Sequence, residues 1–367
     1  MDDQVAVPTD QELADLLDQF VCVRMVQMWG VDLNRFQFDF AMTWAAFFSN
    51  ADGTIYGRYG TRTGGREGAM KQISLSGFKE ALVGALELHE RYTEAPQNTA
   101  PELAGKQPQY RAPWKRAQDI PMIKKRKLAI PFQGKPNTHR SCIHCHHIPN
   151  HEMWSMYDSR KPIPDHKIWP FPMPNVIGMH MDARERATVM EVAKGTPAAE
   201  AGVQVGDEIM RFDGQAILST ADMQWVLHNA ENPDQLSLHV QRDGQLEELS
   251  IELGEGWRDQ IVDWRFFNLQ LMNWAVGFNG HSLTAEQAQH AGLRPDQLGF
   301  RVRRADKTKL KADLKQGDLI IEVDGKRDRM TLAMFTAYVT QEKKRGSSLQ
   351  LVRRRKGKDR AIKVRVQ

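Results

Sequence analysis

A repeat in the second half of the chain constrains the fold more than any other feature. Residues 201–214 read AGVQVGDEIMRFDG, and residues 312–325 read ADLKQGDLIIEVDG. In both copies Gly-Asp precedes an apolar run that is typical of a buried strand, and Asp-Gly follows at the same separation. A repeat of this kind predicts one domain per copy. We expect these domains to cover residues 175–256 and 257–367, as short strands joined by turns.

The two copies resemble bacterial PDZ domains. The first has Gly-Thr-Pro-Ala-Ala at 195–199, where a short helix is expected, and Ser219 as the cap of a longer helix beside the peptide groove. In the second copy Thr331 takes the capping position, whereas residues 305–309 depart from the Gly-Thr-Pro-Ala-Ala pattern.

This resemblance implies a site for the C-terminus of a protein or peptide. PDZ domains add such a peptide to an open strand edge, and loop N–H groups surround its carboxylate. The matching residues in the first copy are Ile177, Gly178, Met179 and His180. Glycine allows the backbone to approach the carboxylate closely. The matching loop of the second copy is 276–279. A packing module with an empty groove is the alternative.

A second motif lies near the middle of the chain, where Cys142, Cys145 and His146 form C-x-x-C-H. This spacing is typical of covalent haem c attachment, with His146 as an axial iron ligand. Four nearby side chains are candidates for the sixth ligand: Met153, Met156, His151 and His166. Zinc bound by the cysteines and nearby histidines is the alternative cofactor.

The first 92 residues show a different pattern. Residues 10–20 have helical spacing, residues 21–26 read as a buried strand with Cys22 in the core, residues 44–60 read as a hairpin, and residues 76–92 read as a helix. This order resembles the second part of a thioredoxin-like domain, whose redox motif would lie before Met1. We therefore expect the coding sequence to continue upstream, through a cysteine or selenocysteine motif and an export signal.

Residues 93–174 are expected to be an irregular connector that contains the C-x-x-C-H segment. Prolines concentrate in its last part, residues 161–174, where they favour a loop that could cover a haem. The net charge of the 367 residues is +4, and no basic stripe is interleaved with aromatic residues. Nucleic acid is therefore not an expected partner. No stretch is long and apolar enough to span a membrane, and no signal peptide is visible.

Taken together, the parts resemble a bacterial family of thioredoxin-like/PDZ proteins, some of which are selenoproteins. The resemblance rests on residues 36–39, 50–60 and 142–146, and on 256–258 followed by Trp264 and Arg265. It implies an α+β multidomain fold, with a partial thioredoxin-like domain followed by two PDZ-like barrels or sandwiches. The chain contains no Gly-x-Ser-Gly-type stretch, so a serine protease is not expected, and no catalytic residue is assigned.

The expected function is that of a periplasmic redox or electron-transfer protein. It would carry one covalent haem c and exchange electrons with a redox partner, and its PDZ modules would bind a partner or peptide. The alternative is a non-catalytic scaffold or adaptor with a structural zinc site. Covalent haem attachment occurs outside the cytoplasm, which is the reason for the periplasmic assignment.

Overall fold

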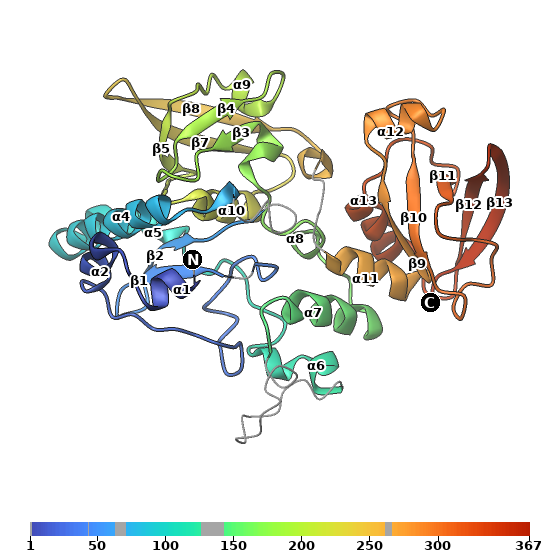
Figure 1. Cartoon of the computed structure of the whole chain (residues 1–367), viewed down its shortest axis with the longest axis horizontal. Coiled ribbons are helices and arrows are strands. Elements are labelled where there is room, and N and C mark those ends of the chain that lie inside the picture. Colours follow the sequence, from blue (N-terminus) through green and yellow to red (C-terminus); the bar gives the residue numbers. More distant parts are fainter. Residues whose placement is uncertain (1, 43, 63–70, 126–142, 261–265) are drawn as a thin grey trace. The chain divides into compact units, whose positions relative to one another are not determined.

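The computed structural model describes residues 2–42, 44–62, 71–125, 143–260 and 266–367. The chain divides into two compact units, which are described separately (Figure 1). The first unit consists of Met1–Ile148 and Pro170–Arg258, and the second of Pro149–Trp169 and Asp259–Gln367. No helix among the described residues is long and apolar enough to cross a membrane.

The first unit begins with a helical and hairpin part. Its elements are α1 (Asp2–Ala6), α2 (Gln11–Leu17), β1 (Ala46–Ser49), β2 (Ile55–Tyr59), α4 (Leu75–Glu94) and α5 (Pro96–Ala104). The predicted helix, hairpin and long helix are thus confirmed. Asp10 caps α2 by accepting a hydrogen bond from the Leu13 N–H, and Phe48 of β1 packs with Phe78 of α4 in one apolar cluster. The helices and the hairpin of this part therefore form at the residues that the local sequence pattern predicts.

The predicted buried strand at residues 21–26 is wrong. These residues are coil, and Val21 and Val23 are 95% and 81% exposed. The sheet formed by β1 and β2 has only these two strands among the described residues, so the apolar run has no strand beside it with which to pair. An apolar run becomes a buried strand only where a neighbour supplies hydrogen bonds and cover.

Cys22 is therefore exposed, and it is expected to react with iodoacetamide in the folded protein. Partial burial of the sulfur and the nearby Asp18 carboxylate raise the pKa of the Cys22 thiol above 9.0. Because the thiolate is the nucleophile, labelling should be slow at pH 7 and several-fold faster at pH 9. Peptide mapping by mass spectrometry would follow Cys22 separately from the more buried Cys145. Labelling of Cys22 only after urea is added would contradict its exposure.

The expected irregular connector contains several short helices. They are η1 (Ala117–Asp119), α6 (Pro121–Lys125), α7 (His147–Asp158) and α8 (Asp165–Ile168), in addition to α5. Prolines begin α5 and α6, at the first helical position, where the missing N–H would have no partner inside the helix. An irregular segment is predicted for residues 93–140, but in these two places a proline starts a helix. Residues 126–142 lie outside the described part.

The rest of the first unit corresponds to the first repeat copy. Its elements are η3 (Pro174–Ile177), β3 (Met179–Met181), β4 (Val189–Val192), α9 (Pro197–Glu200), β5 (Glu208–Phe212), β6 (Gln215–Ala216), α10 (Thr220–Asn229), β7 (Asp234–Arg242) and β8 (Gln245–Leu253). The strands form an antiparallel sheet of order β6-β5-β7-β8 and a separate β3-β4 pair. Both contribute to one core, in which Phe212 and Leu238 are fully buried. The core strand and the capped helix are thus confirmed.

The second unit contains the second copy. After η4 (Trp257–Gln260), whose first two residues belong to the first unit, come α11 (Phe266–Ala275), β9 (Phe278–Ser282), α12 (Ala285–His290), β10 (Phe300–Ala305), β11 (Leu319–Val323), α13 (Leu332–Ala337), η5 (Tyr338–Glu342), β12 (Ser348–Arg355) and β13 (Lys358–Arg365). The five strands form one antiparallel sheet of order β13-β12-β11-β10-β9, drawn in orange and red in Figure 1. Phe278, Phe300 and Phe335 pack together in its core.

The two copies share hydrogen bonds as well as sequence. Asp207 accepts a bond from the Gln204 N–H, and Asp318 accepts one from the Lys315 N–H, each at 2.8 Å. Each carboxylate also binds an arginine of its own terminal hairpin through both carboxylate oxygens: Asp207 binds Arg242 and Asp318 binds Arg355. The Asp of each repeated Gly-Asp pair therefore fastens a loop to a hairpin, and this explains why the pair recurs.

Acid should weaken the second unit through these ion pairs. Hydrogen bonds from Arg355 lower the pKa of Asp313, and bonds from Arg355 and Lys315 lower that of Asp318 even though burial raises it. A carboxylate with a lowered pKa in the folded state stabilises the fold above its ordinary value of 3.8, and this stability is lost as the pH falls through the lowered value. Calorimetry from pH 7 to pH 2 should show a smaller decrease in melting temperature for Arg355→Met than for the unmodified chain. Equal decreases would contradict this account.

Candidate functional site

The open edge of β3 is the first component of the candidate site. The bonds from Ala193 N to Gly178 O and from Asp182 N to Thr188 O lie on the side of β3 that faces β4. Because antiparallel strands alternate their bonding direction, the N–H and C=O groups of Met179 and Met181 point to the other edge. No described residue bonds them. The edge of β3 is therefore unpaired among the described residues, although Met179 and Met181 themselves are buried.

The loop before β3 is shaped by a glycine. Gly178 ends η3 with φ +96°, a left-handed conformation that favours glycine. Its N–H already bonds to Asn175 O, and a Cβ atom at this position would lie 1.9 Å from Thr196 Oγ1. Ile177 is buried and His180 is half-buried. Of the four residues predicted to bind a carboxylate, Met179 therefore has the amide best placed to do so.

Helix α10 is the second component of the candidate site, and it begins at the predicted cap Ser219. Met223, Val226 and Leu227 of this helix lie in the core with β3. Helical spacing places Trp225 and His228 on the opposite side. That side is covered as well, because every residue from Thr220 to His228 is buried. Figure 1 shows the reason: α10 lies between the strands of its own repeat copy and the N-terminal elements.

A buried ion pair fixes α10 to the N-terminal part. Asp222 Oδ2 is 2.9 Å from Lys106 Nζ, and neither side chain is more than 2% exposed. Asp222 also accepts bonds from the backbone N–H groups of Arg58 and Leu218. Burial lowers the pKa of Arg58 to about 10 and also lowers that of Lys106, although Asp222 acts in the opposite direction on both. The Asp222 carboxylate thus favours the charged forms of two buried side chains, Arg58 and Lys106.

Three residues from outside α10, Thr61, Phe171 and Met173, form a cluster of contacts beside this helix. Gln224 Nε2 donates to Phe171 O at 2.9 Å, and Gln224 Oε1 lies 2.5 Å from Thr61 Oγ1. Phe171 N donates to His228 Nδ1 at 3.3 Å, and the Phe171 ring stacks on the His228 ring with centroids 4.0 Å apart. Met173 Sδ is 3.0 Å from the same Thr61 hydroxyl.

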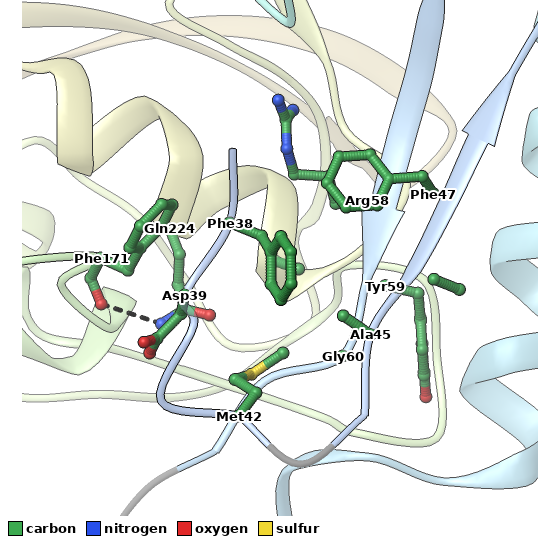
Figure 2. Close-up of a pocket in the computed structure, with 12 residues that line it drawn as sticks. Phe38, Asp39, Met42, Ala45, Phe47, Arg58, Tyr59, Gly60, Phe171 and Gln224 are labelled. Atoms are coloured by element: carbon green, nitrogen blue, oxygen red, sulfur yellow. Dashed lines mark hydrogen bonds between the residues drawn. The ribbon is translucent and has the colours of Figure 1, made fainter. Parts of the chain in front are cut away.

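A small pocket borders these contacts (Figure 2). Its volume, including the open mouth, is about 280 Å³, and its lining is mainly apolar, with Phe38, Met42 and Phe47 opposite Phe171. Figure 2 shows Gln224 and its bond to Phe171 at one side of this space. Aromatic rings here pack edge to face, as do Phe38 and Phe47 at 5.6 Å. The pocket is therefore a packing gap between the N-terminal part and α10.

The C-x-x-C-H segment is only partly described. Cys142 lies outside the described residues, while Cys145 and His146 are half-buried in the first unit. Burial lowers the pKa of His146, and His144 lowers it further. In the second unit His151, Met153 and Met156 are buried in α7, and His166 is half-buried in α8. Within the described ranges, no three His, Cys, Asp or Glu side chains are arranged to hold a metal ion.

Sequence reasoning missed the residues that cover α10. Thr61 and Gln224 are 163 positions apart, and Phe171 belongs to a segment that was read as a loop over a haem. None of them falls in a recognisable motif. One signal was present in the sequence of α10: large apolar or aromatic side chains occur on both sides of this helix, which predicts that both sides are covered.

Comparison with known proteins agrees with the geometry of the β3 edge. The PDZ domain model matches residues 175–253. A DegP-like periplasmic serine endoprotease of Pseudomonas savastanoi pv. phaseolicola is 30% identical over 118 residues, which are 31% of this chain and 24% of the relative. The periplasmic serine endoprotease DegP of Escherichia coli K12 is 30% identical over 90 residues, 24% of this chain and 19% of the relative. The chain thus spans about a quarter or less of these relatives.

Two solved structures are also similar. The HtrA3 PDZ domain bound to a phage-derived ligand is 28% identical, with a TM-score of 0.18, covering 21% of this chain and 81% of that chain. An HtrA-type protease with a decapeptide is 19% identical, with a TM-score of 0.20, covering 31% of this chain and 35% of that chain.

These relatives correct the expected function. The prediction of a thioredoxin-like electron-transfer protein with haem c is contradicted, because the relatives are serine endoproteases. The alternative prediction of a non-catalytic adaptor is contradicted for the same reason. The matched parts cover 24% and 19% of these two proteases, and the chain itself contains no Gly-x-Ser-Gly-type stretch. The PDZ resemblance is confirmed for the first copy. Residues 175–253, with the free β3 edge and the Gly178 loop, are a PDZ domain.

Proposed function

We propose that this chain recognises polypeptide C-termini through its first PDZ domain, as part of proteolysis in the periplasm. The observation that carries the proposal is the free edge of β3 directly after the Gly178 loop. A peptide added there would bond to the N–H and C=O groups of Met179 and Met181 and place its carboxylate near the Met179 amide. The periplasmic location and the link to proteolysis are inferred from the relatives, which are periplasmic serine endoproteases.

The proposal is tested by fluorescence anisotropy on the full chain. The probe is a fluorescein-labelled pentapeptide that ends in valine with a free carboxylate. A dissociation constant in the micromolar range, about −8 kcal/mol, is expected. The same peptide with a C-terminal amide should bind at least about tenfold more weakly, since the loop amide then has no charged acceptor. Equal binding of the two peptides, or binding of neither, would contradict the proposal.

A further inference from the structure

The sheets of the two units end in edge strands of opposite charge. Strand β8 is an outermost strand of the four-stranded sheet in the first unit, and β13 is an outermost strand of the five-stranded sheet in the second. β8 (QLEELSIEL) contains three glutamates and no lysine or arginine. β13 (KDRAIKVR) contains four basic residues and one acid, Asp359, which binds Arg354 of β12 through both carboxylate oxygens. One edge is therefore acidic and the other is basic.

The outer edge of β8 is unpaired among the described residues. Ser237 O of β7 accepts a bond from Asp213 N, on the side of β7 that faces β5. Because bonding direction alternates along antiparallel strands, Ser250, the partner of Ser237 on β8, points its own N–H and C=O away from β7. The same holds for every second residue from Leu246 to Glu252, and all of these are exposed. Helix α9 lies near β8 but shares the buried core of its inner face.

Strand β13 presents its outer edge in the same way. Gln350 O of β12 accepts a bond from Asp324 N, on the side of β12 that faces β11. Lys363, the partner of Gln350 on β13, therefore points its N–H and C=O outward, as does Ala361. Both residues are exposed, and nothing within the described ranges bonds these groups. Each of the two edges can therefore take one more strand.

Charge determines which strand each edge can take. Like charges on directly opposite residues destabilise a strand pair, and charged side chains protect an edge against pairing with an identical edge. Two β13 edges, or two β8 edges, therefore repel one another. Glu248, Lys363 and Arg365 form no ion pair with a described residue, so their charges are available to an edge of opposite charge.

We propose that β8 of one copy of this chain pairs with β13 of a second copy, antiparallel and edge to edge. The partner is thus a second copy of the chain, and the interface joins two unlike edges. Because every copy carries both edges, association is head-to-tail and can continue beyond two copies. Neither edge belongs to the peptide site at β3, so this inference does not depend on the proposed function.

The antiparallel arrangement also specifies a register. It places the core faces of the two sheets on one side, since β8 and β13 are the equivalent edges of two repeat copies. With Ser250 opposite Lys363, Glu248 lies opposite Arg365 on the solvent face. On the core face, the same register sets apolar side chains beside one another: Leu249 beside Val364 and Ile251 beside Ile362. Ion pairing and apolar contact therefore agree on one register.

The first test is a charge exchange, measured by sedimentation equilibrium of the full chain. The unmodified chain should associate more as its concentration rises, and less at high salt, because exposed charges are screened. Glu248→Lys places like charges opposite each other and should raise the dissociation constant at least about fivefold, and Arg365→Glu should do the same. The variant with both changes restores a pair of opposite charges and should associate like the unmodified chain. Glu255→Lys, an equal change of charge outside β8, is the matched control and should leave association unchanged.

The second test places a disulfide across the expected register. Opposite residues of a bonded antiparallel pair have Cα atoms about 5.5 Å apart, a separation that a disulfide can bridge. Two chains are prepared, Ser250→Cys and Lys363→Cys, each with Cys22→Ser because Cys22 is exposed. When mixed and mildly oxidised, they should form a dimer crosslinked through the two introduced cysteines, which peptide mapping by mass spectrometry identifies. Neither chain should form this crosslink alone.

The outcomes are distinct. Rescue of association by the double charge exchange, together with the crosslink, would support the interface. If the chain stays monomeric at every concentration, the charges only keep each edge unpaired and the inference is wrong. It is also wrong if the copies associate but neither charge reversal weakens association, since they then meet elsewhere. Every substituted residue is exposed, so the variants are expected to fold.

Discussion

Replacing Asp222 by asparagine is expected to destabilise the first unit by about 3–5 kcal/mol, the usual cost of removing one partner of a buried ion pair. The substitution keeps the shape of the side chain but removes its charge. Lys106, whose side chain is 0% exposed, is then left without its counterion, and the buried Arg58 lies near it. The measurement is urea unfolding of the full chain, followed by tryptophan fluorescence, since Trp225 packs beside this cluster.

The control for this prediction removes both charges. The double variant Asp222→Asn with Lys106→Met should recover part of the lost stability, because it leaves no unpaired charge buried at these two positions. The expected order of stability is the unmodified chain, then the double variant, then Asp222→Asn alone. A loss of less than about 1 kcal/mol for Asp222→Asn would show that the ion pair does not hold α10 in place.

Replacing Gly178 by alanine is expected to reduce peptide binding by at least about tenfold. The φ of +96° is strained for alanine, and its Cβ would lie 1.9 Å from Thr196 Oγ1. Thr196 is held by its own bond to Ala193 O, so the loop rather than the threonine is expected to shift. A shifted loop moves the Met179 amide away from the carboxylate. Anisotropy with the valine-ended peptide measures the loss.

Gly195 supplies a matched control in the same domain. It also has a positive φ, +69°, but a Cβ there meets nothing within 4 Å. Gly195→Ala therefore carries a comparable backbone strain, about 1 kcal/mol, without the clash. It should bind the peptide like the unmodified chain. Equal losses of binding in the two variants would mean that general destabilisation, rather than the geometry of the Gly178 loop, determines the result.

Features that depend on local signals could be predicted from the sequence. The repeat predicted two related sheets, and the Asp207 and Asp318 contacts show that its Gly-Asp pairs have one structural role. Ser219 and Thr331 were expected at helix starts and cap α10 and α13. Gly178 was expected in a loop that only glycine fits, and its conformation agrees. Each of these needs only a few neighbouring residues to determine it.

Features that depend on contacts between distant residues could not be predicted from the sequence. Lys106 lies among polar neighbours and reads as a surface residue, yet it is fully buried because Asp222, far along the chain, compensates its charge. Residues 21–26 read as a buried strand, yet they are exposed, because burial needs a neighbouring strand that no local pattern reveals. The contacts of Gln224 belong to the same class, since Thr61 and Phe171, from distant parts of the chain, both bond to it.

The central claim, that a peptide C-terminus adds to the free edge of β3, is tested most directly by NMR of the full chain labelled with ¹⁵N-methionine. The chain has 17 methionines, and Met179→Leu and Met181→Leu would each remove one amide peak and so identify it. Titration with the valine-ended peptide should shift the Met179 and Met181 peaks and protect both amides from hydrogen exchange. If the peptide binds while both peaks stay unchanged, it binds elsewhere and the claim is wrong.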